Sequence, residues 1–115
     1  MALILEQTEM STIFGSEKCL LNVLNQGANP DGSKPEGLRF LKNMIVFDKE
    51  ISEKLASLCK KYDIKLYLYS DLIQDSKNDT KAPEYDHTQT KRDAIFTISY
   101  TSGTENNPKG AMLTN

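Results

Sequence analysis

Apolar residues recur at helical spacing in two stretches of the chain. In the first, Leu20, Val23 and Leu24 lie three or four positions apart and share one face of a helix. Ser16 stands where an N-cap residue is expected, and Gly27 follows as a stop signal. The pattern therefore predicts an amphipathic helix between Ser16 and Gly27.

The second stretch, Lys49 to Tyr62, predicts a longer helix that lies on a sheet. Its charged residues, such as Glu53 and Lys60, fall away from the apolar positions, and Asp48 precedes it as a candidate N-cap. The predicted apolar face consists of Ile51, Leu55, Leu58, Cys59 and Tyr62.

Short runs of apolar and β-branched residues predict strands at positions 11–15, 44–47, 66–69 and 95–100. The run at 44–47 is apolar at every position, which is typical of a strand buried on both faces. The end of a helix at 3–10 and a short helical turn at 70–73 complete the predicted elements.

Two polar stretches are predicted to be exposed loops, at about 27–38 and 74–93. The first contains half of the glycines and half of the prolines of the chain. The order of strands and helices predicts an α/β fold, and 115 residues allow at most one domain. We expect a mostly parallel sheet with right-handed crossover helices, ending in a phosphate-binding loop.

Charge and cysteine usage narrow the possible partners. The formal net charge of -2 provides no basic field for binding nucleic acid or an anionic membrane. The N-terminal residues predict neither a signal peptide nor an apolar stretch long enough to span a membrane.

Cys19 and Cys59 lack metal-ligand spacing, and buried thiols in a reducing, intracellular compartment are expected. The lone His87 lies in a polar loop, where a catalytic or metal role is not indicated.

The candidate chemistry lies where the strand at 95–100 ends. Ligands of parallel α/β sheets bind beyond the carboxyl ends of the strands, and this end carries hydroxyls, glycines and a lysine. The candidate phosphate-binding residues are Thr101, Ser102, Gly103, Thr104, Lys109 and Gly110. The loop matches neither G-x-G-x-x-G nor the P-loop pattern G-x-x-x-x-G-K-[ST]. From composition alone, a general anion site and an ordinary polar loop both stay open.

The string itself is more specific. Tyr100–Thr104 (YTSGT), followed by Pro108–Gly110 (PKG) and Met112–Thr114 (MLT), closely resembles the phosphate-binding signature of AMP-forming acyl-CoA synthetases, in particular the long-chain fatty acid branch. The resemblance implies a ligase that uses ATP to convert a fatty acid to an acyl-adenylate and then transfers the acyl group to coenzyme A. It implies that Thr101 to Thr104, Lys109 and Gly110 hold the ATP phosphates, with Mg²⁺ accompanying the nucleotide. It also implies that residues 1–115 are one partial domain, a fragment of the enzyme's mostly parallel sheet, and that the intact enzyme is cytoplasmic or acts at the cytosolic face of the endoplasmic reticulum or other membranes.

Three positions differ from that signature, namely Glu105, Asn106 and Asn115. Glu105 facing a phosphate would oppose Lys109, whereas turned outward it would only remove a hydroxyl. The other motifs of the family lie downstream of this signature, so we expect no complete reaction from this chain alone. A truncated product and an incomplete gene model are both compatible with that expectation. Two alternatives stay open: a non-catalytic phosphate- or nucleotide-binding module, and an interaction module that folds against a partner.

Overall fold

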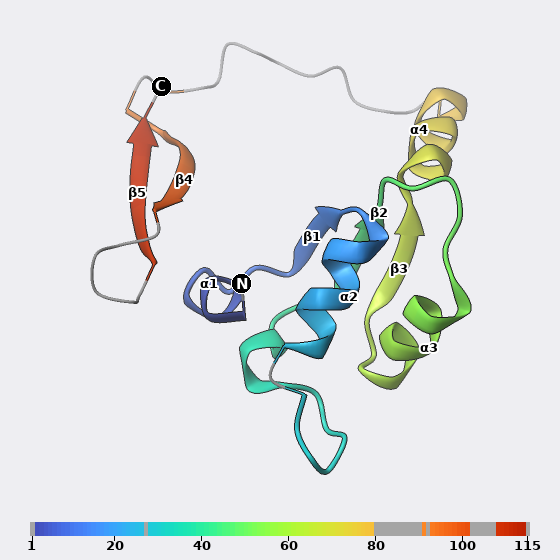
Figure 1. Cartoon of the computed structure of the whole chain (residues 1–115). Coiled ribbons are helices and arrows are strands. Elements are labelled where there is room, and N and C mark those ends of the chain that lie inside the picture. Colours follow the sequence, from blue (N-terminus) through green and yellow to red (C-terminus); the bar gives the residue numbers. More distant parts are fainter. Residues whose placement is uncertain (1, 27, 80–90, 92, 102–107, 115) are drawn as a thin grey trace. The chain divides into compact units, whose positions relative to one another are not determined.

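The computed structural model describes residues 2–26, 28–79, 91, 93–101 and 108–114 (Figure 1). The chain divides into two units, Met1–Thr80 and Lys81–Asn115. The first unit contains α1 (Ala2–Gln7), β1 (Thr12–Gly15), α2 (Glu17–Asn25), the 3-10 turn η1 (Glu36–Leu38), β2 (Asn43–Val46), α3 (Glu53–Lys61), β3 (Lys65–Leu68) and α4 (Tyr69–Asn78). The second contains β4 (Ile95–Thr101) and β5 (Lys109–Thr114).

The first unit is a three-stranded parallel sheet with helices, which confirms the predicted α/β class. The strand order is β1-β2-β3, and α2 and α3 connect consecutive strands (Figure 1). Ile13, Met44 and Leu66 are Cα partners across the three strands and face the hydrophobic core. The helices contribute the side chains predicted from their spacing, including Leu20, Val23, Leu24, Leu55, Cys59 and Tyr62.

The opposite face of this sheet carries aromatic residues. Phe14, Ile45 and Tyr67 are partners in the next row of the sheet, and Phe14 is 55% exposed. The Phe47 ring lies 6.0 Å from that of Phe14 and 5.3 Å from that of Tyr69. Burial on both faces is confirmed for Met44, Ile45 and Val46, but Phe47 lies beyond the strand and is exposed.

The side chains that cap the two helices differ from those predicted. Asp48 does not cap α3, because that helix begins later and Ser52 Oγ accepts its capping hydrogen bond from Leu55 N at 3.3 Å. Asp48 Oδ2 instead accepts from Glu17 N, at 2.6 Å, at the start of α2. Ser16 occupies the N-cap position of α2, but its side chain makes no capping bond. Parallel strands end at the same edge of a sheet, so a residue following β2 can reach the helix that follows β1.

A second carboxylate completes this connection between the helix starts. Glu17 Oε2 accepts a hydrogen bond from Ser52 N at 3.0 Å. The two acidic side chains thus satisfy backbone donors at the beginning of α2 and just before α3, where helices leave N–H groups without intrahelical partners.

Other boundaries shift by short distances, with one larger change. The strand predicted at 66–69 is β3, which ends at Leu68, and Tyr69 begins α4. The helical turn predicted at 70–73 is the beginning of α4, which continues to Asn78 into the stretch predicted as a loop. The rest of that predicted loop lies largely outside the described residues.

The second unit corrects the placement of the last strand. We expected residues 95–100 to join the parallel sheet, whereas β4 pairs antiparallel with β5 in a separate two-stranded sheet. No strand was predicted at Lys109–Thr114, where the structure has β5. Once that segment is extended, it is a nearby partner for β4, and antiparallel pairing needs no crossover connection.

Replacing Asp48 with alanine should lower the free energy of unfolding by about 1 kcal/mol, because the start of α2 loses the carboxylate that accepts from Glu17 N. Ser16→Ala is the matched control and should cost much less, since the Ser16 side chain makes no capping bond. Urea unfolding curves of both variants measure the difference. Equal losses for Asp48→Ala and Ser16→Ala would contradict this description of the capping.

The Cys59 thiol should make stability depend on pH in the alkaline range. Burial raises its pKa from 9.0 to about 11, so between these values the unfolded thiol ionises while the folded one keeps its proton. The contribution of the buried thiol is therefore complete below pH 9 and is lost as the pH rises toward 11. Urea titrations across this range should show a smaller decline for Cys59→Ala than for the native chain. Cys19→Ala, at an exposed thiol, should keep the native decline, and an unchanged decline in Cys59→Ala would refute the assignment.

Candidate functional site

The pairing of β4 with β5 brings together part of the predicted phosphate site. Thr101, the last residue of β4, is the Cα partner of Lys109, the first residue of β5. Tyr100 is likewise the partner of Gly110. The structure thus places three of the predicted residues, Thr101, Lys109 and Gly110, at one end of the ladder. The other three, Ser102, Gly103 and Thr104, lie outside the described residues.

The hairpin of β4 and β5 has two chemically different faces. Side chains alternate along each strand, so Thr97, Ser99 and Thr101 share one face. Their partners on β5 are Leu113, Ala111 and Lys109, in that order. The three hydroxyl-bearing residues of β4 are exposed, and we call this face the polar face after them, although its β5 side also carries Leu113 and Ala111. The polar face ends at the pair of Thr101 and Lys109. The other face carries Ile98, Tyr100, Gly110 and Met112.

The end of the polar face has the groups that an anion requires. Directly opposite residues of an antiparallel pair have Cβ atoms about 5 Å apart, so the Thr101 hydroxyl and the Lys109 ammonium group can reach the same ligand. A hydroxyl supplies one hydrogen-bond donor and an ammonium group supplies three together with a positive charge. Both side chains are exposed to solvent, so a phosphate can approach without displacing the core. The hydroxyl and the ammonium group together fit a ligand with linked phosphate groups.

Two side chains pack closely over Gly110 in the hairpin. A Cβ atom built at this position would lie 3.0 Å from Ile98 Cγ2 and 3.1 Å from Tyr100 Cζ. Such distances are shorter than ordinary van der Waals contact, so the absence of a side chain admits the Tyr100 ring. Gly110 was predicted as a phosphate-binding residue, whereas Thr97, Ser99 and Tyr100 were not among the candidate phosphate-binding residues. Alternation of hydroxyl and apolar residues from Thr97 to Thr101 was the signal for the polar face.

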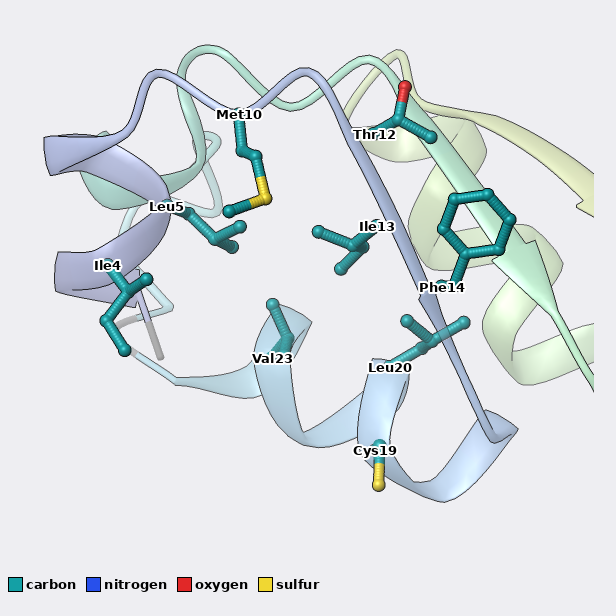
Figure 2. Close-up of a pocket in the computed structure, with 9 residues that line it drawn as sticks. All are labelled: Ile4, Leu5, Met10, Thr12, Ile13, Phe14, Cys19, Leu20 and Val23. Carbon is teal, nitrogen blue, oxygen red and sulfur yellow. The ribbon is translucent and has the colours of Figure 1, made fainter. Parts of the chain in front are cut away.

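The first unit contains an apolar pocket of a different character (Figure 2). Its volume is about 290 Å³, and it lies among α1, β1 and α2. The Thr12 hydroxyl at its edge accepts a hydrogen bond from Asn43 Nδ2 at 3.0 Å, and Figure 2 shows the Cys19 sulfur directed away from the other lining side chains. No charged residue lines it, so this pocket does not suit a phosphate. Its lining residues are Ile4, Leu5, Met10, Thr12, Ile13, Phe14, Cys19, Leu20 and Val23.

The described part of the chain contains neither a membrane-spanning helix nor a metal-binding cluster. None of its helices combines the length and the apolar character needed to cross a membrane. Within the same residues, no group of three or more His, Cys, Asp or Glu side chains is arranged to hold a metal ion. The candidate site rests on the pairing of Thr101 with Lys109 in the hairpin.

Comparison with known proteins agrees with the chemistry of the hairpin. Residues 1–115 match the family described as AMP-binding enzyme, so the chain belongs to this family. It is also similar to fatty acyl-CoA synthetase B of Dictyostelium discoideum, with 30% identity over 109 residues. This match covers 95% of the chain but only 15% of the relative. No solved structure matches the chain. The resemblance to AMP-forming acyl-CoA synthetases is thereby confirmed.

Proposed function

We propose that the β4–β5 hairpin binds the phosphates of ATP and is the phosphate-binding part of a long-chain fatty acid–CoA ligase. The pairing of Thr101 with Lys109 is the observation that carries this proposal. It sets a hydroxyl donor beside a cation at the end of an exposed polar face. The matched family, AMP-binding enzyme, supports a nucleotide as the ligand rather than a phosphate ester in general.

The residues of the hairpin position the phosphates and stabilise their charge. The Lys109 ammonium group offsets negative charge, and the Thr101 hydroxyl fixes the orientation of one phosphate oxygen. Ser102, Gly103 and Thr104 follow Thr101 directly and extend the proposed site with further hydroxyls and backbone N–H donors. Mg²⁺ bound to the nucleotide would supply additional charge neutralisation. No general base is required of these residues.

The fatty acid and coenzyme A belong to the proposal for the whole protein. The similar protein of Dictyostelium discoideum is called a fatty acyl-CoA synthetase, which supports an acyl group as the second substrate. Since the match covers 15% of that relative, the acyl and coenzyme A sites are not assigned to residues of this chain. In this proposal, the described residues contribute the binding of the ATP phosphates.

Calorimetric titration of the 115-residue chain with Mg-ATP tests the proposal. Lys109→Ala should weaken binding about tenfold or more, because a charge-assisted hydrogen bond contributes roughly 1.5–3 kcal/mol. Thr101→Val keeps the β-branched shape and removes the hydroxyl, and should weaken binding by a smaller factor. Lys54→Ala, at an exposed position of α3, is the matched control for loss of one positive charge and should bind as the native chain does.

The same titrations contain the contradicting results. A native chain that does not bind Mg-ATP refutes the proposed function. Equal weakening by Lys109→Ala and Lys54→Ala would show that net charge, and not the hairpin, attracts the nucleotide. Raising the salt concentration should weaken binding by the native chain, because the charged Lys109 side chain lies at the surface.

A further inference from the structure

The Tyr100 ring occupies the space that the missing side chain of Gly110 leaves free. The two residues are Cα partners, and the position of a Gly110 Cβ would be only 3.1 Å from Tyr100 Cζ and 3.4 Å from Tyr100 Cε1. Ile98 Cγ2 approaches the same position to 3.0 Å. Tyr100 is half-buried, whereas most described side chains of the hairpin are exposed. The Tyr100 ring and the Ile98 side chain thus both pack closely over Gly110.

Tyr100 lies on the face opposite the proposed phosphate site. Adjacent residues of a strand point to opposite faces, so Tyr100 and Gly110 share one face while Thr101 and Lys109 share the other. Any effect of the ring on a ligand of Thr101 and Lys109 must therefore pass through the backbone. The quantity that the ring can control is the register of the two strands.

Register decides whether the proposed site exists. A shift of one residue would turn every side chain of one strand to the other face, separating Thr101 from Lys109. Isolated two-stranded hairpins are marginally stable, and this one already has an irregularity between Ile95 and Thr97 at its far end. An aromatic ring packed over a cross-strand glycine is a known way to fix such pairing, since only glycine leaves room for the ring.

We propose that Tyr100 is a positioning residue, whose ring packs over Gly110 and fixes the register that places Thr101 opposite Lys109. The consequence for ATP rests on the proposed function, whereas the consequence for register does not. Tyr100 contacts no phosphate in this arrangement. It acts on Thr101 and Lys109 through the strands that carry them.

Two measurements on the full chain test this proposal separately. NMR reports the register through contacts between backbone protons of partner residues, and through the shift that an aromatic ring imposes on the α-protons of Gly110. Calorimetry reports Mg-ATP affinity. Tyr100→Ala should abolish the ring-induced shift, remove the contacts expected of Thr101 opposite Lys109, and weaken Mg-ATP binding about tenfold, as Lys109→Ala does.

Matched variants separate register control from a loss of apolar surface. Tyr100→Phe keeps the ring and should retain both the register and the affinity. Met112→Ala removes a side chain from the same face without touching the ring-over-glycine contact, and should also retain both. Gly110→Ala should disturb the register while Tyr100 is present, because the added methyl group meets the ring. In the Tyr100→Ala background, the same glycine substitution should cost less, because the added methyl group then meets Ile98 Cγ2 but no longer the ring.

Retention of the native register and affinity in Tyr100→Ala would overturn the proposal. So would equal losses in Tyr100→Ala and Met112→Ala, or a Gly110→Ala effect that is the same with and without the ring. If the native chain does not bind Mg-ATP, the proposed function fails, but the NMR comparison still decides whether Tyr100 controls the register.

Discussion

The alternation of side chains along paired strands is the constraint on which both units depend. In the parallel sheet, the register that aligns Ile13, Met44 and Leu66 directs all three toward the core beneath α2 and α3. In the hairpin, the register that aligns Thr101 with Lys109 directs both to one exposed face. A shift of one residue would bury polar groups in the first unit and disperse the candidate site in the second.

The two units protect their register by different means. The strand β2 is bonded on both sides, its residues Met44, Ile45 and Val46 are buried, and helices cover one face of the sheet. Displacing it would expose a large apolar surface to water. The hairpin has no core of its own among the described residues, and its apolar residues Ile98 and Met112 are exposed. Local packing, such as that of the Tyr100 ring over Gly110, therefore contributes more to the register of the hairpin.

Local sequence patterns predicted much of the fold. Periodicity identified the buried faces of α2 and α3, and the continuous apolar run identified β2. Both signals depend only on the types and spacing of residues that are close in sequence. The capping of α2 by Asp48 joins positions far apart in sequence, and the pairing of β4 with β5 depends on which segments meet. Neither can be derived from local propensity.

The signature names six phosphate-binding residues, and the structure describes three of them. Thr101, Lys109 and Gly110 lie at one end of the ladder, and phosphate binding by all six residues stays a prediction. The contribution of Tyr100 was missed, although the residue belongs to the motif, because the contact with Gly110 exists only once the strands are paired. A motif identifies chemistry by residue type, whereas positioning depends on the geometry around it.

The most direct test of the account is an NMR titration of the isotopically labelled chain with Mg-ATP, followed residue by residue. The account predicts that the largest shifts occur at Thr101, Lys109 and their neighbours on the polar face of the hairpin. Shifts concentrated in β1, β2, β3 or their helices, with the hairpin unchanged, would contradict it.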